Sequence, residues 1–152
     1  MTEHIETCQI AATPTQVWKQ LADFGAISTW ATGVDHSALI TSQSADVGAA
    51  RRIQAGRLAL IETVTVWQPE QELAYTLHGL PPVVKSVTNT WKLTPAAGGT
   101  AVLLTTSIDP GSTPRGKVAA KVLGLILGRA SKRMLQGLET IVTSNSKGVA
   151  SS

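Results

Sequence analysis

Apolar and polar residues alternate along much of the chain, which is the pattern of strands in a sheet with one buried face. The clearest run is 86–94, where Val87, Asn89, Trp91 and Leu93 share one parity and the residues between them are Ser, Thr and Lys. Turn sequences rich in Gly and Pro separate such runs at short intervals. The pattern predicts about five or six antiparallel strands after a first strand at the start of the chain.

Hydrophobic residues change to a helical spacing after this first strand, which we place at residues 4–11. Thr13 is a suitable cap and Pro14 a suitable first residue of a helix. The sequence therefore predicts a short helix over 14–22. A second short helix or turn is predicted over 26–30.

A long helix is predicted in the last third of the chain. It begins after Ser112-Thr113-Pro114 and extends to about Ser144. Gly124 and Gly128 are placed at the edge and on the charged side of this helix. Residues rich in Ser, Gly and Lys follow, and we expect a flexible tail over 146–152. The apolar stripe of the helix comprises Ala119, Leu123, Ile126, Leu127, Ala130, Met134, Leu138 and Ile141.

Composition is compatible with one domain, which we place at residues 1–145. The chain has 152 residues, of which 43% are hydrophobic and 15% charged, so we expect a large core. Cys8 is the single cysteine, which excludes an internal disulfide and a cysteine-based metal site. The polar, acidic first residues do not resemble a signal peptide. We therefore expect a cytoplasmic protein.

Four segments resemble, in this order along the chain, the START-like helix-grip superfamily, in its branch of polyketide cyclase/dehydrase and lipid-transport-like proteins. The resemblance covers residues 3–143. It implies an α+β helix-grip fold, with two short helices after the first strand and a seven-stranded curved antiparallel sheet that wraps around the long C-terminal helix and an elongated pocket. The segments are Pro14-Thr-Gln-Val-Trp18 with Leu21-Ala-Asp-Phe24 and Trp30, then Val47-Gly-Ala-Ala-Arg-Arg52, then Leu58-Ala-Leu-Ile-Glu62 with Leu73-Ala-Tyr75, then Asn89-Thr-Trp91 with Gly98-Gly99-Thr100.

Polar residues at inward positions are the best candidates for a site. Asn89 shares its parity with Val87 and Trp91, and Glu62 lies among apolar residues of its own parity. An ionised, buried Glu62 would need Arg51 or Arg52 nearby, because an unpaired buried charge is costly. We interpret such a pair as structural, with proton transfer as the alternative. The expected ligand-binding residues are Trp30, Arg52, Glu62, Tyr75, Asn89, Trp91, Leu123 and Leu127.

Catalytic and metal-binding motifs are missing from the sequence. His4, His36 and His78 have no partner at a motif spacing, and Asp35-His36-Ser37 cannot form a triad because adjacent residues cannot orient one another in that way. We therefore assign no catalytic residue, metal ligand or cofactor.

Basic residues concentrate in the predicted long helix. Six of the thirteen Lys and Arg residues lie within residues 115–133, which contain no acid. This helix face could be simply solvated, could contact a membrane surface through Lys117, Lys121, Arg129 and Lys132, or could bind an acidic partner. We expect no nucleic-acid partner, and the oligomeric state stays open.

Three functions are compatible with these features. The first is binding or transport of a small hydrophobic ligand, such as a lipid, isoprenoid or polyketide-like molecule, in an internal cavity. The second is a polyketide cyclase/dehydrase-type enzyme that acts mainly by positioning its substrate. The third is an interaction protein that uses the basic helix. Convergence of Arg52, Glu62, Tyr75 or Asn89 on an open cavity would favour the second, and a filled core without a cavity would favour the third.

Overall fold

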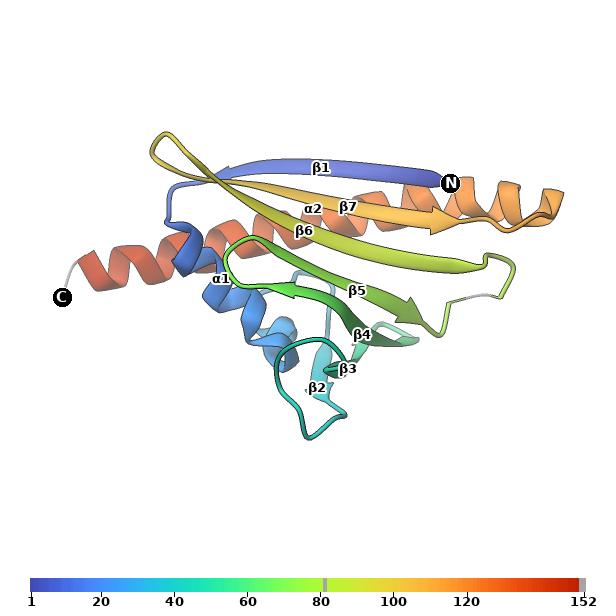
Figure 1. Cartoon of the computed structure of the whole chain (residues 1–152), viewed down its shortest axis with the longest axis horizontal. Coiled ribbons are helices and arrows are strands. Elements are labelled where there is room, and N and C mark those ends of the chain that lie inside the picture. Colours follow the sequence, from blue (N-terminus) through green and yellow to red (C-terminus); the bar gives the residue numbers. More distant parts are fainter. Residues whose placement is uncertain (81, 151–152) are drawn as a thin grey trace.

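A curved antiparallel sheet wraps around a long C-terminal helix (Figure 1). The computed structural model describes residues 1–80 and 82–150, with side chains up to residue 145, and in these residues the sheet has seven strands. Their order is β1-β7-β6-β5-β4-β3-β2. The sheet predicted from the family resemblance is thereby confirmed. The strands are β1 (Thr2–Ile10), β2 (His36–Leu39), β3 (Ala50–Ala55), β4 (Leu58–Gln68), β5 (Glu72–His78), β6 (Ser86–Ala96) and β7 (Gly99–Asp109).

Two short helical segments follow β1. Helix α1 (Pro14–Ala22) begins with a capping box, in which the Thr13 hydroxyl accepts a hydrogen bond from the Gln16 N–H at 3.2 Å and the Gln16 side chain accepts one from the Thr13 N–H at 2.9 Å. These bonds satisfy backbone donors that the helix itself leaves unpaired. The 3-10 helix η1 (Phe24–Thr29) takes the place of the segment predicted over 26–30.

The long helix α2 (Pro114–Ala150) begins at the predicted proline. It continues beyond Ser144, where the sequence analysis ends it, and no proline interrupts the chain after Pro114. The backbone of 146–150, which belongs to the predicted tail, is helical, and residues 151–152 lie outside the described residues. Along the described chain no helix is long and apolar enough to cross a membrane.

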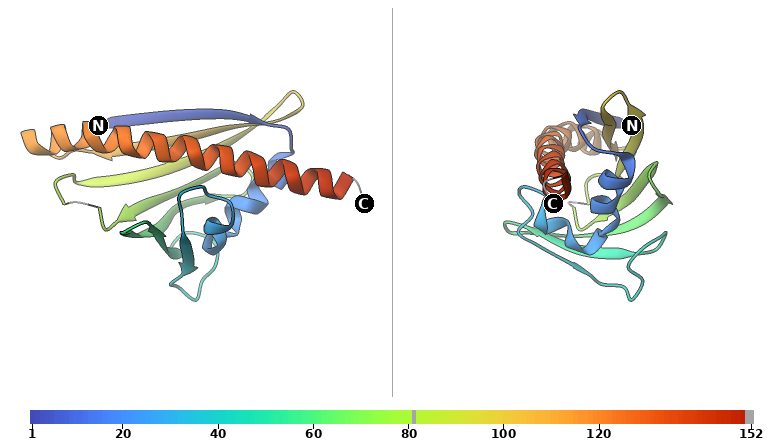
Figure 2. Two further views of the ribbon diagram at one scale, coloured as in Figure 1. Left: turned by 180° about the vertical axis from the view of Figure 1, so that it is seen from behind. Right: turned by 90° about the vertical axis from the view of Figure 1, so that its left-hand side faces the viewer.

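Helix α2 packs along β1 and β7 (Figure 2). A row of small residues faces the sheet. Gly116, Ala120, Gly124 and Gly128 follow one another at four-residue spacing, share one helix face and are buried. The space beside them is occupied, since a Cβ added at Gly128 would lie 2.7 Å from the His4 ring. The missing side chains allow the helix backbone to approach β1 closely.

This close approach corrects the predicted orientation of α2. Gly124 and Gly128, which the sequence analysis places toward the charged side, face the sheet. Ile126 and Ala130 belong to the predicted buried stripe, but both are exposed. The prediction is wrong here because it assumes that the largest apolar side chains face the sheet, whereas small residues make that contact.

Three aromatic pairs connect the α1–η1 segment to the inner face of the sheet. Each pair has an edge-to-face geometry, which is favourable for aromatic rings at these separations. The pairs therefore fix the position of the helical segment over the strands. Their ring centroids are 5.1 Å apart for Trp18 and Trp67, 5.7 Å for Phe24 and Tyr75, and 6.0 Å for Trp30 and Trp91.

Candidate functional site

A row of polar residues crosses the inner face of the sheet among apolar neighbours. Tyr75 of β5 lies opposite Asn89 of β6, and Asn89 lies opposite Thr106 of β7. Nearby, Arg51 of β3 lies opposite Glu62 of β4. All five residues are buried. Since residues at paired positions share a face of the sheet, the predicted Glu62, Tyr75 and Asn89 do lie on one face.

Arg51 is the most constrained polar side chain of this row. Its Nε donates to Oε1 of Glu62 at 2.8 Å, and its Nη1 donates to the carbonyl oxygen of Phe24 at 2.8 Å. The guanidinium carbon lies 3.7 Å from the centre of the Phe24 ring and 4.7 Å from that of Tyr75. The ion pair with Glu62 and the two aromatic rings together compensate for the free-energy cost of burying the charge of Arg51. The remaining nitrogen, Nη2, is buried without a hydrogen-bond partner.

Arg52, one of the expected ligand-binding residues, does not belong to this arrangement. It is exposed, and its side chain lies on the opposite face of β3 from that of Arg51. The sequence analysis leaves Arg51 and Arg52 open as partners of Glu62, and the structure selects Arg51. A signal for this choice exists in the sequence, because Arg51 shares its parity with Ala49 and Ile53, both of which are buried.

Tyr75 connects the guanidinium to the aromatic core. Its hydroxyl oxygen accepts a hydrogen bond from Nε1 of Trp91 at 3.1 Å. Burial raises the pKa of Tyr75, the carboxylate of Glu62 raises it further, and the charge of Arg51 and hydrogen bonds from Trp91 and Asn89 oppose the increase. The phenol is therefore neutral at physiological pH. Among the described residues we find no acceptor for its own proton.

Asn89 is held by a chain of hydroxyl groups. The Thr106 hydroxyl donates to Oδ1 of Asn89 at 2.7 Å, and Oγ of Ser131 lies 3.1 Å from the same hydroxyl. Since Thr106 has used its only proton, Ser131 of α2 donates to Thr106. This chain fixes the orientation of the Asn89 amide, with its oxygen toward β7. The sequence does not single out Thr106 or Ser131, because they become partners only when β7 and α2 pack together.

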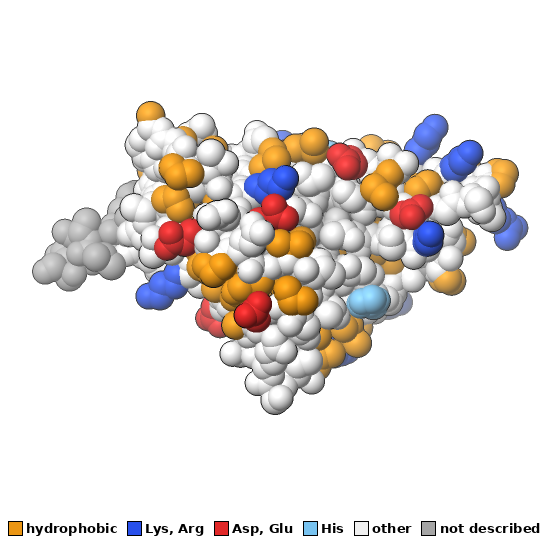
Figure 3. Space-filling model, in the orientation of Figure 1, with side chains coloured by type: hydrophobic (Ala, Val, Ile, Leu, Met, Phe, Trp, Pro, Cys, Tyr) orange, Lys and Arg blue, Asp and Glu red, His pale blue; other side chains and the backbone are white. Residues whose placement is uncertain are grey.

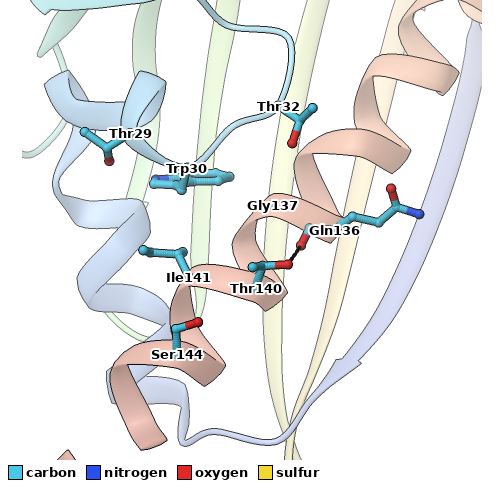
Figure 4. Close-up of a pocket in the computed structure, with 8 residues that line it drawn as sticks. All are labelled: Thr29, Trp30, Thr32, Gln136, Gly137, Thr140, Ile141 and Ser144. Carbon is cyan, nitrogen blue, oxygen red and sulfur yellow. Dashed lines mark hydrogen bonds between the residues drawn. The ribbon is translucent and has the colours of Figure 1, made fainter. Parts of the chain in front are cut away.

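Trp30 lies where η1 meets the second half of α2 (Figure 4). Its ring is buried against Trp91, and its Nε1 has no hydrogen-bond partner. A surface pocket of about 260 Å³ adjoins the residue. The pocket is lined by Thr29, Trp30, Thr32, Gln136, Gly137, Thr140, Ile141 and Ser144.

The two predicted leucines of α2, Leu123 and Leu127, are half-buried and pack against the apolar core. A second surface pocket, of about 380 Å³, lies where β5 turns into β6. Its lining includes Leu80, Val84 and Lys85.

The three histidines lie outside this row of buried polar residues. His4 lies against α2 at Gly128 and its Nε2 is 2.9 Å from Oε1 of Glu6, while His36 and His78 are exposed. Within the described residues no group of three His, Cys, Asp or Glu side chains is arranged to hold a metal ion. The polar chemistry of the interior thus rests on Arg51, Tyr75 and their neighbours.

Comparison with known proteins identifies the family of nearly the whole chain. Residues 1–143 match the model of the family described as polyketide cyclase / dehydrase and lipid transport. Comparison with curated protein sequences gave no match.

Solved structures of the same fold include two aromatase/cyclases. The ZhuI aromatase/cyclase from a Streptomyces species has a TM-score of 0.77 and 16% identity, with 93% of each chain covered. The di-domain ARO/CYC StfQ of the steffimycin biosynthetic pathway has a TM-score of 0.76 and 14% identity, covering 95% of this chain and 51% of StfQ. TTHA0849 from Thermus thermophilus has a TM-score of 0.74 and 19% identity, covering 95% and 99%. At these identities the similarity establishes the fold alone.

Proposed function

Because the chain belongs to the polyketide cyclase/dehydrase and lipid transport family, we propose that it binds a small hydrophobic ligand that carries a hydrogen-bond acceptor. The family accounts for the hydrophobic part of this proposal. The acceptor is inferred from the buried polar groups of this chain. A lipid, an isoprenoid or a polyketide-like molecule with a carbonyl or hydroxyl oxygen has the required chemistry.

The observation that carries the proposal is a set of buried donors without acceptors. Nη2 of Arg51 and Nε1 of Trp30 are the two buried side-chain nitrogens or oxygens without a partner in the described part of the chain. The Tyr75 hydroxyl accepts from Trp91 and leaves its own proton available. An unsatisfied buried donor costs about 1–3 kcal/mol, so a bound acceptor oxygen would recover this free energy.

These donors belong to one aromatic cluster. Arg51 stacks on Tyr75, Tyr75 is bonded to Trp91, and Trp91 packs edge-to-face on Trp30. Aromatic walls supply apolar contact area, while the few donors orient the ligand. Of the expected ligand-binding residues, Trp30, Glu62, Tyr75, Asn89 and Trp91 retain this role in the proposal, Leu123 and Leu127 supply apolar surface, and Arg51 replaces Arg52. We place this carrier in the cytoplasm, since Cys8 is free.

An enzyme of the cyclase/dehydrase type is the second candidate. The observation in its favour is the neutral Tyr75 phenol beside the Arg51 cation, since both could donate to a carbonyl oxygen and polarise it. In this case Tyr75→Phe would abolish turnover of a poly-β-ketone while the substrate still binds. A carrier would release every ligand unchanged.

Extraction is the first experiment. Organic solvent applied to the protein from its native source, followed by mass spectrometry, should release an apolar compound with at least one acceptor oxygen. Displacement of bound anilinonaphthalene sulfonate then tests the acceptor directly, with acetylnaphthalene and ethylnaphthalene as competitors. These two molecules differ in one carbonyl oxygen, and we expect about tenfold stronger competition by acetylnaphthalene.

Variants assign the effect to the buried donors. Arg51→Met should remove the preference for acetylnaphthalene, whereas Arg52→Met, at the exposed neighbouring position, should retain it. Trp30→Phe removes a donor with little change in shape, which makes it informative even where Arg51→Met is poorly folded. Absence of any bound compound together with equal competition by the two naphthalenes would contradict the proposal.

A further inference from the structure

The first half of α2 presents large apolar side chains to solvent. Val118, Val122, Leu125 and Ile126 are 65%, 55%, 72% and 60% exposed. Val118, Val122 and Leu125 have the spacing i, i+4, i+7 that aligns side chains along one helix face, and Ile126 lies beside them. We call these four residues the apolar strip. Contiguous exposed apolar surface of this kind commonly marks an interaction site.

Basic side chains border the apolar strip. Lys117 and Lys121 form the adjacent row of the helix, and Arg129 follows Leu125 by one turn. All three are exposed, and the chain contains no acid between Asp109 and Glu139. Lys and Arg side chains gather at the end of the molecule where α2 begins (Figure 3). The apolar strip therefore lies in a positively charged part of the helix.

The start of α2 also touches the loop that leads from β5 to β6. A Cβ added at Gly116 would lie 2.9 Å from the carbonyl oxygen of Val83. Val83 is itself exposed, and its neighbours Pro82, Val84 and Lys85 line the pocket of about 380 Å³. The apolar strip, the basic residues and this pocket thus lie at the same end of the protein.

We propose that the first half of α2 docks on the surface of an anionic lipid bilayer. The apolar strip would enter the region between headgroups and acyl chains, while Lys117, Lys121 and Arg129 would remain among the anionic headgroups. Both parts are needed, because interfacial helices bind through buried apolar area together with attraction to charged lipid.

Charge complementarity selects the bilayer over a second copy of the chain. A symmetric dimer through the strip would bring Lys117, Lys121 and Arg129 of one copy close to the same residues of the other. Such like-charge contacts oppose association, whereas anionic headgroups attract these residues. The docking does not depend on the proposed ligand-binding function.

Flotation with lipid vesicles tests the docking. The protein without added ligand should float with vesicles of phosphatidylcholine and phosphatidylglycerol and should not float with phosphatidylcholine alone. Lys117→Glu with Lys121→Glu should weaken partitioning by at least about 25-fold, from about fivefold for each charge removed. Leu125→Ser should weaken it about tenfold. High salt should weaken binding of the unmodified protein.

Matched controls change similar residues elsewhere. Lys19→Glu with Lys92→Glu reverses two exposed charges away from the strip, and Val47→Ser removes an exposed apolar side chain from a loop. Neither should reduce flotation. The proposal would be overturned if the protein floated equally with both vesicle types, or with neither, or if the α2 variants floated as well as the unmodified protein. It would also be overturned if ultracentrifugation showed a dimer that Leu125→Ser dissociates. Naphthalene competition measured on the same samples shows whether ligand binding fails independently.

Discussion

Arg51 and Glu62 face each other across β3 and β4 and form an ion pair of 2.8 Å in the interior of the protein. Removal of one partner leaves a buried charge without compensation, which typically costs about 3–5 kcal/mol. We therefore expect Arg51→Met and Glu62→Leu each to lower the free energy of unfolding by about this amount. Urea denaturation followed by circular dichroism measures both.

The double variant Arg51→Met/Glu62→Leu should be more stable than the sum of the two single changes predicts. It removes both charges, so neither remains unpaired in the core. Strict additivity would show that the pair contributes nothing specific. Arg52→Met is the control, because Arg52 is exposed, and it should change stability by less than about 0.5 kcal/mol.

Tyr75 is the only tyrosine of the chain, so its ionisation can be followed by ultraviolet absorbance. Burial and Glu62 raise its pKa above the ordinary value of 10.0, so the phenol should ionise at higher pH in the folded protein than in urea. Its contribution to stability is complete below the unfolded pKa and is lost as pH rises through the folded pKa. Glu62→Gln should lower the pKa and Trp91→Phe should raise it. A titration of the folded protein that matches free tyrosine would contradict this environment.

Cys8 should react slowly with thiol reagents. Burial and the carboxylate of Glu139, whose Oε2 lies 3.5 Å from the sulfur, raise the pKa of the thiol from 9.0 to about 11. Near neutral pH this lowers the thiolate fraction, and with it the rate, about 100-fold. Glu139→Gln should speed the reaction with Ellman's reagent. Glu6→Gln, on the same strand as Cys8, should not. A faster reaction in Glu6→Gln but not in Glu139→Gln would show that Glu139 is not the carboxylate that raises the pKa of Cys8.

Two glycines of α2 should respond oppositely to alanine. A Cβ at Gly137 would overlap the carbonyl oxygen of Trp30, so Gly137→Ala should destabilise the protein by about 1–3 kcal/mol. A Cβ at Gly124 would meet Ile108 and Thr2 at 3.8 Å, which is ordinary contact. Gly124→Ala should therefore stabilise by up to about 1 kcal/mol through helix propensity. Thermal unfolding of the two variants measures the difference. Equal changes in Tm for Gly137→Ala and Gly124→Ala would argue against the observed packing of α2.

Strands and their inward faces could be predicted because alternation with a period of two reports burial directly. This is why Asn89, Tyr75 and Glu62 lie on the face where the sequence analysis expects them. The choice of Arg51 over Arg52 is signalled in the sequence only by the parity that Arg51 shares with Ala49 and Ile53, and the pairing of β3 with β4 settles it. The hydroxyl chain from Ser131 to Asn89 joins residues far apart in sequence and requires the packed structure.

The face of α2 that packs against the sheet is predicted wrongly. A wheel built on hydrophobicity places Ile126 inside and Gly128 outside, and the structure reverses both. The informative signal is the spacing of Gly116, Ala120, Gly124 and Gly128, because small residues mark a helix face that approaches a neighbouring backbone closely. Val118, Val122, Leu125 and Ile126 are then left for the surface that we assign to the bilayer.

The pairing of β1 with β7 also has a consequence for the order of folding. Strand β1 (Thr2–Ile10) lies at the end of the strand order and pairs with β7 (Gly99–Asp109), and α2 packs against both. On the ribosome the N-terminal strand must therefore wait unpaired until nearly the whole sheet has been synthesised. Contacts so distant in sequence slow folding and prolong the exposure of an unpaired strand. Synthesis of α2 is thus the step at which a nascent chain of this protein can first become native.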